Sequence, residues 1–404
     1  MNLLKKSRLG ELIDVTRGAS LSGEYYSTKG EYIRLTCGNF DYHNNCFKEN
    51  TSKDNLFYTG EFREEFLLEK GDIITPLTEQ AIGLLGTTAR IPKSGKYIQS
   101  QDIALVKCKA GKIDPTFCYY LISSRLVRNQ LSAAAQQTKI RHTSPDKIKA
   151  CTVWIPELDE QITIGRLLAS LDDKIHLNKR INDNLEAMAK QLYDYWFVQF
   201  DFPNEEGKPY KSSGGAMVWN DKLKREIPQG WSTLPILAIL DKYPTTKRYE
   251  TKEYLSFGKY PIIDQGDAYI VGFTNEDDNL LTRHPAVLFG DHSTKVKFLD
   301  FDFARGADGT QILYSSNEAV SQYYLYLAIC ALQIPNPGYS RHFKYLKELP
   351  IIIPSKTMAN KFTKIVKPLF ENWTKNVFCN IILTKQRDEL LPLLMNGQAS
   401  VNSD

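Results

Sequence analysis

The stretch Ile155–Phe197, IPELDEQITIGRLLASLDDKIHLNKRINDNLEAMAKQLYDYWF, is one long helical pattern in the middle of a 404-residue chain. Its apolar residues recur in steps of three and four, the spacing of a heptad seam. From Thr163 to Phe197 basic and acidic side chains are equal in number. The stretch therefore predicts a helix that binds another helix and not DNA. The seam residues are Ile164, Leu168, Leu171, Ile175, Ile181, Leu185, Met188, Leu192 and Tyr195, with Asn178 where two registers meet.

A weaker copy of this stretch returns 198 residues later and carries Asn178 onto Asn376. The match includes the preceding extended segment and, with a small change of offset, an earlier helix start, in which Tyr119-Tyr120-Leu121 recurs as Tyr323-Tyr324-Leu325. Two helices of equal length with matching stripes predict a pair whose register is fixed by a polar Asn. Pro368 predicts a kink or a new helix start in the second copy. The second stripe is Phe362, Val366, Leu369, Trp373, Cys379, Leu383, Gln386, Leu390 and Leu393.

The chain is expected to have an α+β fold, with two globular α/β domains separated by two long helices that pair as an antiparallel coiled coil. Short strand-like runs between Gly-rich turns occur in both domains. A segment rich in Gly, Pro and Ser separates the first helix from the second domain and is expected to be a linker. The boundaries are 1–155 for the first domain, 156–200 for its helix, 201–230 for the linker, 231–353 for the second domain and 354–404 for its helix.

The composition, 42% hydrophobic and 24% charged, is that of a globular protein. No apolar run approaches the ~20 residues needed to cross a bilayer, and the seven cysteines are odd in number without a CxxC pair. A cytoplasmic protein is therefore expected. Cys37, His43 and Cys46 lie close together without a fourth ligand at zinc spacing, so no metal site is expected.

The positive charge is concentrated in one block. Thr88–Lys149 holds twelve Lys or Arg against three Asp and no Glu, a net of +9. Such a block indicates a polyanionic partner, although a solvated surface remains an alternative. Glutamines and hydroxyls in the block can read base edges. The candidate DNA contacts are Arg90, Gln99, Gln101, Gln136, Gln137, Lys139, Arg141 and His142 in the first domain, and Ser293, Lys295, Lys297, Arg305, Arg341 and His342 in the second.

Motifs for catalysis are weak. No Gly-rich nucleotide loop follows a strand. Asn336-Pro337-Gly338-Tyr339 approaches an adenine methyltransferase motif but lacks its second proline, and a turn explains it better. Asp172-Asp173-Lys174, downstream of Pro145-Asp146, approaches a nuclease signature, but solvated charges flanking the seam are the simpler interpretation. No catalytic residue is predicted.

The run ELDEQITIGRLLASLDDKIHLNKRINDNLEAMAKQLYDYWFVQFDFP, followed by IPQGW, resembles the central region of the specificity subunits of type I restriction-modification systems. LGELIDVTRG, GKYPIIDQG and RDELLPLLMNGQASV resemble other parts of that family. The resemblance implies that each domain recognises one half of a split sequence in double-stranded DNA. It implies that the helices set the spacing and that two methyltransferase subunits dock on them. Restriction-translocase subunits would complete the assembly, with S-adenosylmethionine, ATP and magnesium on the partners.

Two alternatives stay open beside this interpretation: a stand-alone nuclease or methyltransferase with fused recognition domains, and a coiled-coil adaptor that never touches nucleic acid. The second helical copy also departs from the family pattern, because SKTMANKF stands where the first has ELDEQITI. The helix length suits a spacer. Roughly 32 residues span about 48 Å at ~1.5 Å each, or about 14 base pairs at ~3.4 Å per step.

Overall fold

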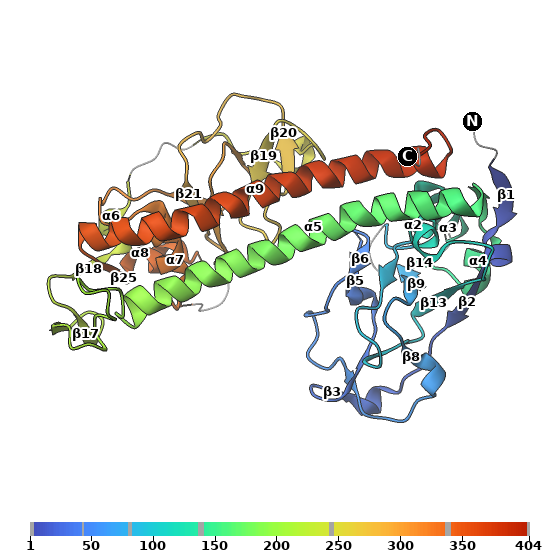
Figure 1. Ribbon diagram of the computed structural model, residues 1–404, viewed down its shortest axis with the longest axis horizontal. Helices are drawn as coiled ribbons and strands as arrows, with labels where there is room; N and C mark the ends of the chain where they lie inside the picture. Colours follow the sequence, from blue (N-terminus) through green and yellow to red (C-terminus); the bar gives the residue numbers. More distant parts are fainter. Residues whose placement is uncertain are drawn as a thin grey trace. The chain divides into compact units, whose positions relative to one another are not determined.

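The computed structural model describes residues 4–42, 44–79, 83–135, 141–241, 246–335 and 341–401. It divides into two compact units: unit 1 is Met1–Ile175 with Ile382–Asp404, and unit 2 is His176–Ile381. Each unit holds one globular domain and a part of both long helices, α5 (Leu158–Tyr193) and α9 (Lys356–Met395), drawn in green and red in Figure 1. Within the described ranges, no helix is long and apolar enough to cross a membrane.

Two small sheets form the domain of unit 1. The four-stranded sheet has the order β11-β9-β13-β2 and is antiparallel, with the buried apolar strands β9 and β13 at its centre. The five-stranded sheet has the order β3-β7-β4-β12-β8, with β4 and β12 parallel. The strands are β2 (Ile13–Arg17), β3 (Tyr26–Ser27), β4 (Tyr32–Arg34), β7 (Phe57–Tyr58), β8 (Leu67–Leu68), β9 (Ile73–Pro76), β11 (Ala89–Arg90), β12 (Tyr97–Ile98) and β13 (Ile103–Cys108).

Short helices and paired strands lead from these sheets to α5. Asp114 caps α2 by accepting hydrogen bonds from the backbone N–H groups of Thr116 and Phe117, and Pro115 occupies the first helical position. The helices are α1 (Leu9–Leu12), α2 (Pro115–Ser123), α3 (Arg125–Ala134) and α4 (Pro145–Ala150). The paired strands are β1 (Lys5–Arg8) with β15 (Thr152–Ile155), β5 (Phe40–Asp41) with β6 (Cys46–Phe47), and β10 (Thr78–Glu79) with β14 (Arg141–His142).

Unit 2 repeats this plan with fewer strands. Its domain has two three-stranded sheets of order β20-β19-β23 and β22-β21-β24, and the pair β18–β25 corresponds to β1–β15. The strands are β18 (Ser232–Pro235), β19 (Tyr260–Ile263), β20 (Gly272–Thr274), β21 (Ala286–Gly290), β22 (Val296–Leu299), β23 (Ala304–Arg305), β24 (Thr310–Leu313) and β25 (Pro350–Ile353). The short helices are α6 (Ile236–Ile239), α7 (Gln322–Ala331) and α8 (Phe343–Glu348).

The segment expected to be a linker is folded against unit 2. A π-helical turn, Asp194–Val198, follows α5. Beyond it Phe202 stacks on both Tyr210 and Trp231, with ring centroids 4.6 and 4.9 Å apart. A hairpin of β16 (Met217–Asn220) and β17 (Arg225–Pro228) completes the segment. Glycine and proline here mark turns in a packed connection and not a flexible tether.

In unit 2, α5 and α9 run antiparallel and meet through asparagines. Asn178 Nδ2 donates to Asn380 Oδ1 at 2.8 Å, and Asn376 Nδ2 donates to Asn182 Oδ1 at 2.9 Å. Adding 198 converts Asn178 into Asn376 and Asn182 into Asn380, so the two bonds are copies of one contact. The internal repeat seen in the sequence is therefore also a local twofold symmetry of the helix pair. The register of α5 against α9 is therefore fixed by four asparagines and not by the single pair expected.

The predicted seam is wrong in register beyond Asn178. Ile181 and Met188 are 38% and 49% exposed, whereas Asn182 and Ala189 are buried. An unstrained helix has 3.6 residues per turn, so a strict heptad drifts off the buried face. The other predicted pairing residues are buried or half-buried in the structure: Leu171, Ile175, Asn178, Leu185, Leu192, Leu369, Trp373, Asn376, Leu383 and Leu390. Helix α9 continues without a break through Pro368, so no new helix starts there.

Candidate nucleic-acid interface

Three chain segments of unit 1 meet at the backbone of Leu77, directly after β9. The Leu77 N–H donates to the carbonyl of Asp102 at 2.7 Å, and its carbonyl accepts from the Thr143 N–H at 2.8 Å. On the next residue, Thr78 Oγ1 donates to Asp102 Oδ1 and lies 3.3 Å from His142 Nδ1. Because these bonds join loops that lie far apart in sequence, they hold neighbouring polar side chains in fixed places.

A buried carboxylate anchors the arginine beside this junction. The Glu79 side chain is only 4% exposed, lies 3.4 Å from the Arg141 guanidinium and accepts from the backbone N–H groups of Gly83 and Leu84. Arg141 also donates to Ser132 Oγ at 3.1 Å. Its guanidinium stays partly exposed, so it can contact an anion from a fixed position.

The corresponding loops of unit 2 are tied together by one glutamine. Gln265 Nε2 donates to the Asp308 carbonyl at 2.6 Å, and Gln265 Oε1 accepts from the His292 N–H at 2.9 Å. Gly309 has φ +82°, and a Cβ there would come within 2.5 Å of Gln265 Nε2. Glycine is therefore required at this close approach. Ser293 Oγ donates to the Gln265 carbonyl, which adds a third link.

The structure sorts the predicted DNA contacts by exposure. Four residues are exposed: Gln101, His142, Lys295 and Arg341. Three are half-buried: Arg90, which lies over the Tyr119 ring, Arg141 and Ser293. Four are buried: Gln99, Lys297, Arg305 and His342. Gln136, Gln137 and Lys139 lie outside the described residues.

The four buried residues have internal roles that make them poor candidates for contact with DNA. Gln99 Nε2 donates to the carbonyls of Thr16 and Ile103. Lys297 Nζ donates to two carbonyls of the 264–268 loop, and Arg305 donates to the Thr246 carbonyl. Residue type could not reveal these internal roles, because the same polar residue can either bond to buried backbone groups or face solvent.

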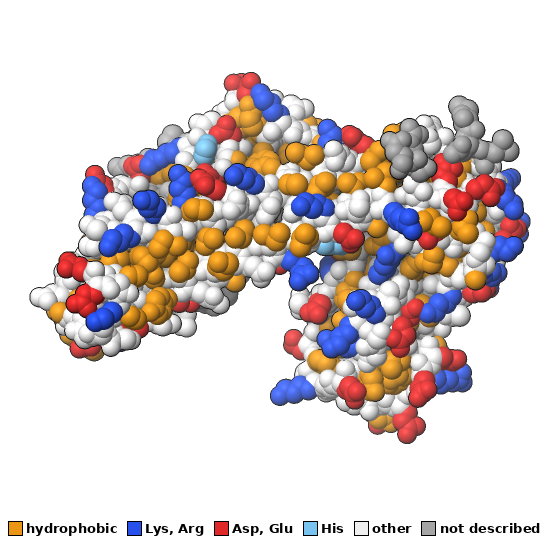
Figure 2. All heavy atoms as spheres, in the orientation of Figure 1, with side chains coloured by type: hydrophobic (Ala, Val, Ile, Leu, Met, Phe, Trp, Pro, Cys, Tyr) orange, Lys and Arg blue, Asp and Glu red, His pale blue; other side chains and the backbone are white. Residues whose placement is uncertain are grey.

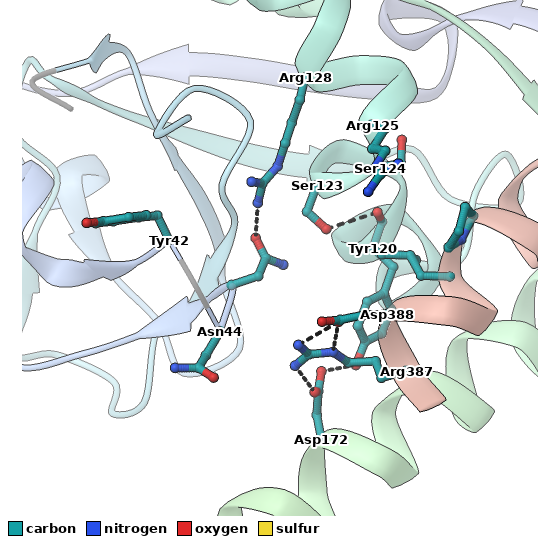
Figure 3. A pocket seen from close by; sticks show the side chains of 13 residues that line it. Tyr42, Asn44, Tyr120, Ser123, Ser124, Arg125, Arg128, Asp172, Arg387 and Asp388 are labelled. Atoms are coloured by element: carbon teal, nitrogen blue, oxygen red, sulfur yellow. Dashed lines mark hydrogen bonds and ion pairs between the residues drawn. The ribbon is translucent and has the colours of Figure 1, made fainter. Parts of the chain in front are cut away.

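A polar junction joins the domain of unit 1 to the two long helices (Figure 3). Arg387 of α9 donates to Asp172 of α5 at 2.8 Å, and Tyr120 of α2 donates to the same carboxylate at 2.6 Å. Both charged side chains are largely buried, at 8% and 16% exposure. The expectation of a solvated Asp172 is therefore wrong. The triad borders a cavity of about 230 Å³ that Arg125 and Arg128 also line.

The electrostatics of the junction follow from burial. Burial alone would lower the pKa of Arg387, but the carboxylates of Asp172 and Asp388 outweigh it and raise that pKa above its ordinary value. Burial, and then the charge of Asp172, raise the pKa of Tyr120. The junction therefore favours a charged Arg387 and a neutral Tyr120. Among the described residues, no cluster of His, Cys, Asp or Glu could hold a metal ion.

A second exposed feature lies on α5 in unit 2. Leu177 is 47% exposed and falls in one stripe with Ile181 and Met188 of α5 and with Tyr195 of the π-helical turn that follows, which are also exposed. The spacing is four residues and then seven, so the stripe follows one face of the helix. On the side drawn in Figure 2, hydrophobic side chains gather along the helix pair. Ile181, Met188 and Tyr195 were predicted as part of the seam and Leu177 was not, but the structure leaves all four accessible.

The geometry defines a class of protein: an internally duplicated chain in which each copy joins a loop-bearing domain to one half of a helix pair. Comparisons agree. Residues 1–187 match the type I restriction modification DNA specificity domain. The chain is 25% identical to the MjaIX specificity subunit of Methanocaldococcus jannaschii over 70% of this chain and 69% of that one. It is 29% identical to the HindI specificity subunit of Haemophilus influenzae over 26% and 23%.

A solved structure shows the same fold along the chain. The S subunit of a type I system from M. genitalium has a TM-score of 0.60 at 17% identity and covers 98% of this chain and 96% of its own. Residues 1–187 therefore match a DNA specificity domain of type I restriction-modification systems, and the chain as a whole has the fold of an S subunit of such a system. Such a subunit recognises DNA and is not itself catalytic.

Proposed function

We propose that each globular domain reads one half of a bipartite DNA sequence and that α5 and α9 set the gap between the halves. The observation that carries this is the internal duplication, which extends from the β1–β15 and β18–β25 pairs through the paired asparagines. Two similar readers in one chain are suited to two half-sites, because each presents its own loops to its own base pairs. The net +9 of Thr88–Lys149 supports contact with a phosphate backbone.

We further propose that methyltransferase subunits dock on the helices, two per chain, and that restriction-translocase subunits join them. The exposed apolar stripe Leu177, Ile181, Met188 and Tyr195 supports a protein partner, since such side chains gain from losing contact with water. A duplicated helix pair can offer two similar surfaces to two identical partners. S-adenosylmethionine, ATP and magnesium would then be bound by the partners.

The test of the reading role is a genome-wide map of methylated adenines in the source cell with and without this gene. We expect a split methylated motif that disappears on deletion. An unchanged methylation map would refute the role. Turnover by the purified chain alone with DNA, magnesium and S-adenosylmethionine would instead favour a stand-alone enzyme.

Docking can be tested separately on the exposed stripe. Ile181→Glu with Met188→Glu should abolish co-purification of the methyltransferase subunit, because two charges would be buried at the contact. Lys179→Glu, at another exposed position of α5, is the matched control. Retention of the partner by the double variant would place the docking surface elsewhere.

A further inference from the structure

The two domains share a loop framework that sequence comparison within the chain did not reach. In unit 1 the Leu77 N–H donates to the Asp102 carbonyl and the Thr143 N–H donates to the Leu77 carbonyl. In unit 2 the Asp291 N–H donates to the Gly309 carbonyl at 2.7 Å, and the His342 N–H donates to the Asp291 carbonyl at 2.7 Å. The same two bonds, in the same order along the chain, therefore join three loops in each domain.

Strand register confirms that these loops are equivalent. Ile103 of β13 pairs with Pro76 of β9, and Thr310 of β24 pairs with Gly290 of β21. Leu77 directly follows Pro76, and Asp291 directly follows Gly290. Asp102 directly precedes Ile103, and Gly309 directly precedes Thr310. The backbone bonds thus connect positions that the sheets had already matched, although none of the paired residues is identical.

This correspondence matches two pairs of exposed side chains. Gln101 of unit 1 corresponds to Asp308 of unit 2, and His142 corresponds to Arg341. All four are exposed, and an arginine accompanies the first pair in each unit: Arg17 Nε donates to the Gln101 carbonyl, and Arg248 forms an ion pair with Asp308. The framework is the same in both domains, but the side chains it presents differ in hydrogen-bonding character.

We propose that these equivalent positions are the base-reading positions of the two domains: Gln101 and His142 for one half-site, Asp308 and Arg341 for the other. The inference rests on the proposed reading of DNA by both domains. A glutamine pairs well with adenine, an aspartate accepts from cytosine and an arginine pairs with guanine. Because the loop framework is the same and the exposed side chains differ, one fold can read two different half-sites.

The framework also gives these residues the rigidity that reading requires. The loop before β13 is held by the Thr78–Asp102 hydrogen bond, and the loop before β24 is held by Gln265. A side chain on a fixed loop loses little further entropy when it meets a base. Asp308 was absent from the sequence-based candidates. It lies in the short loop before β24, and this signal is visible only once the strands are known.

The test uses the complex of this chain with its methyltransferase subunit and a duplex library with randomised half-sites. Arg341→Ala should relax the preference at one base pair of one half-site by about 5- to 150-fold, the equivalent of losing one good base contact. His142→Ala should relax one base pair in the other half-site. The unaltered half-site in each variant shows that the protein remains folded.

Lys344→Ala and Lys112→Ala remove an exposed charge from each domain and should leave both half-sites unchanged. Gln101→Asp should change the preferred base and not merely weaken it. Unchanged preferences in the variants, or a uniform loss over all sequences, would overturn the proposal. If the unmodified complex itself selects no split sequence, the proposed function fails instead.

Discussion

The two places where a domain meets the long helices have opposite chemistry at positions that the internal repeat makes equivalent. In unit 1 the helices are joined by the buried ion pair Asp172–Arg387. The positions 198 residues away in unit 2 are Phe370 and Ala189, which belong to one buried apolar cluster. Phe370 packs against Phe298 with ring centroids 4.4 Å apart. The duplication has placed two residues of an apolar cluster at the positions that hold a buried ion pair in unit 1.

The tyrosines beside these contacts differ in the same way. Tyr120 donates to the Asp172 carboxylate, whereas its counterpart Tyr324 donates to the Ile352 carbonyl at 2.8 Å. Equivalent tyrosines in the two units are therefore compatible with a charged and with a neutral acceptor. A buried ion pair does not have to be more stable than an apolar contact of the same shape. It is more sensitive to losing one partner.

The largest effect is expected from Arg387→Met. This change leaves the Asp172 carboxylate buried without its cation and should destabilise unit 1 by about 3–5 kcal/mol. Hydrogen exchange of buried amides in α2 measures the loss, with α7 of unit 2 as an internal reference. Lys385→Met, which removes an exposed partner of Glu389, should have almost no effect. Equal losses in both variants would contradict the role of burial.

Adding Asp172→Leu to Arg387→Met should recover most of that loss. The double variant makes the junction of unit 1 apolar, like that of unit 2, and removes the unpaired charge. Its stability should lie within about 1 kcal/mol of the unmodified protein, since apolar replacement of a buried pair is often neutral. If the double variant is as unstable as the single one, the ion pair itself is required.

A smaller difference separates the two tyrosines. Tyr120→Phe removes a bond to a charged acceptor and should cost unit 1 about 1.5–3 kcal/mol, while Tyr324→Phe removes a neutral bond and should cost unit 2 about 0.5–1.5 kcal/mol. Exchange rates of amides in each unit give the two values under the same conditions. The reverse order would mean that Asp172 does not depend on Tyr120.

The smallest effect concerns pH in unit 2. Burial lowers the pKa of Lys297 from 10.5 to about 8, although Asp264 and Asp267 partly oppose it. Between these two values the unfolded chain binds more protons, so the contribution of Lys297 to stability rises with pH across that window. Lys297→Met should remove this rise, as seen in exchange of α7 amides. Unit 1 serves as the control, and an unchanged slope would refute the assignment.

The sequence predicted the two domains, the helices and their pairing because these depend on local patterns. Helical periodicity lies within each segment, and the 198-residue repeat places Asn178 and Asn376 at equivalent positions. The same periodicity misplaced Ile181 and Met188, because α5 has two apolar faces from Ile175 onward and only one is covered. Periodicity alone cannot show which face meets a partner helix.

By itself the sequence determined the order of the elements, the duplication and the resemblance to a known family, since each depends on residues that lie close together along the chain. Only the tertiary structure decided that Gln101 faces solvent while Gln99 is buried. It also decided that Asp172 pairs with Arg387 and that Leu77 corresponds to Asp291. The physical reason is that burial and long-range hydrogen bonds arise between segments far apart in sequence. Their partners become known only when the chain is folded.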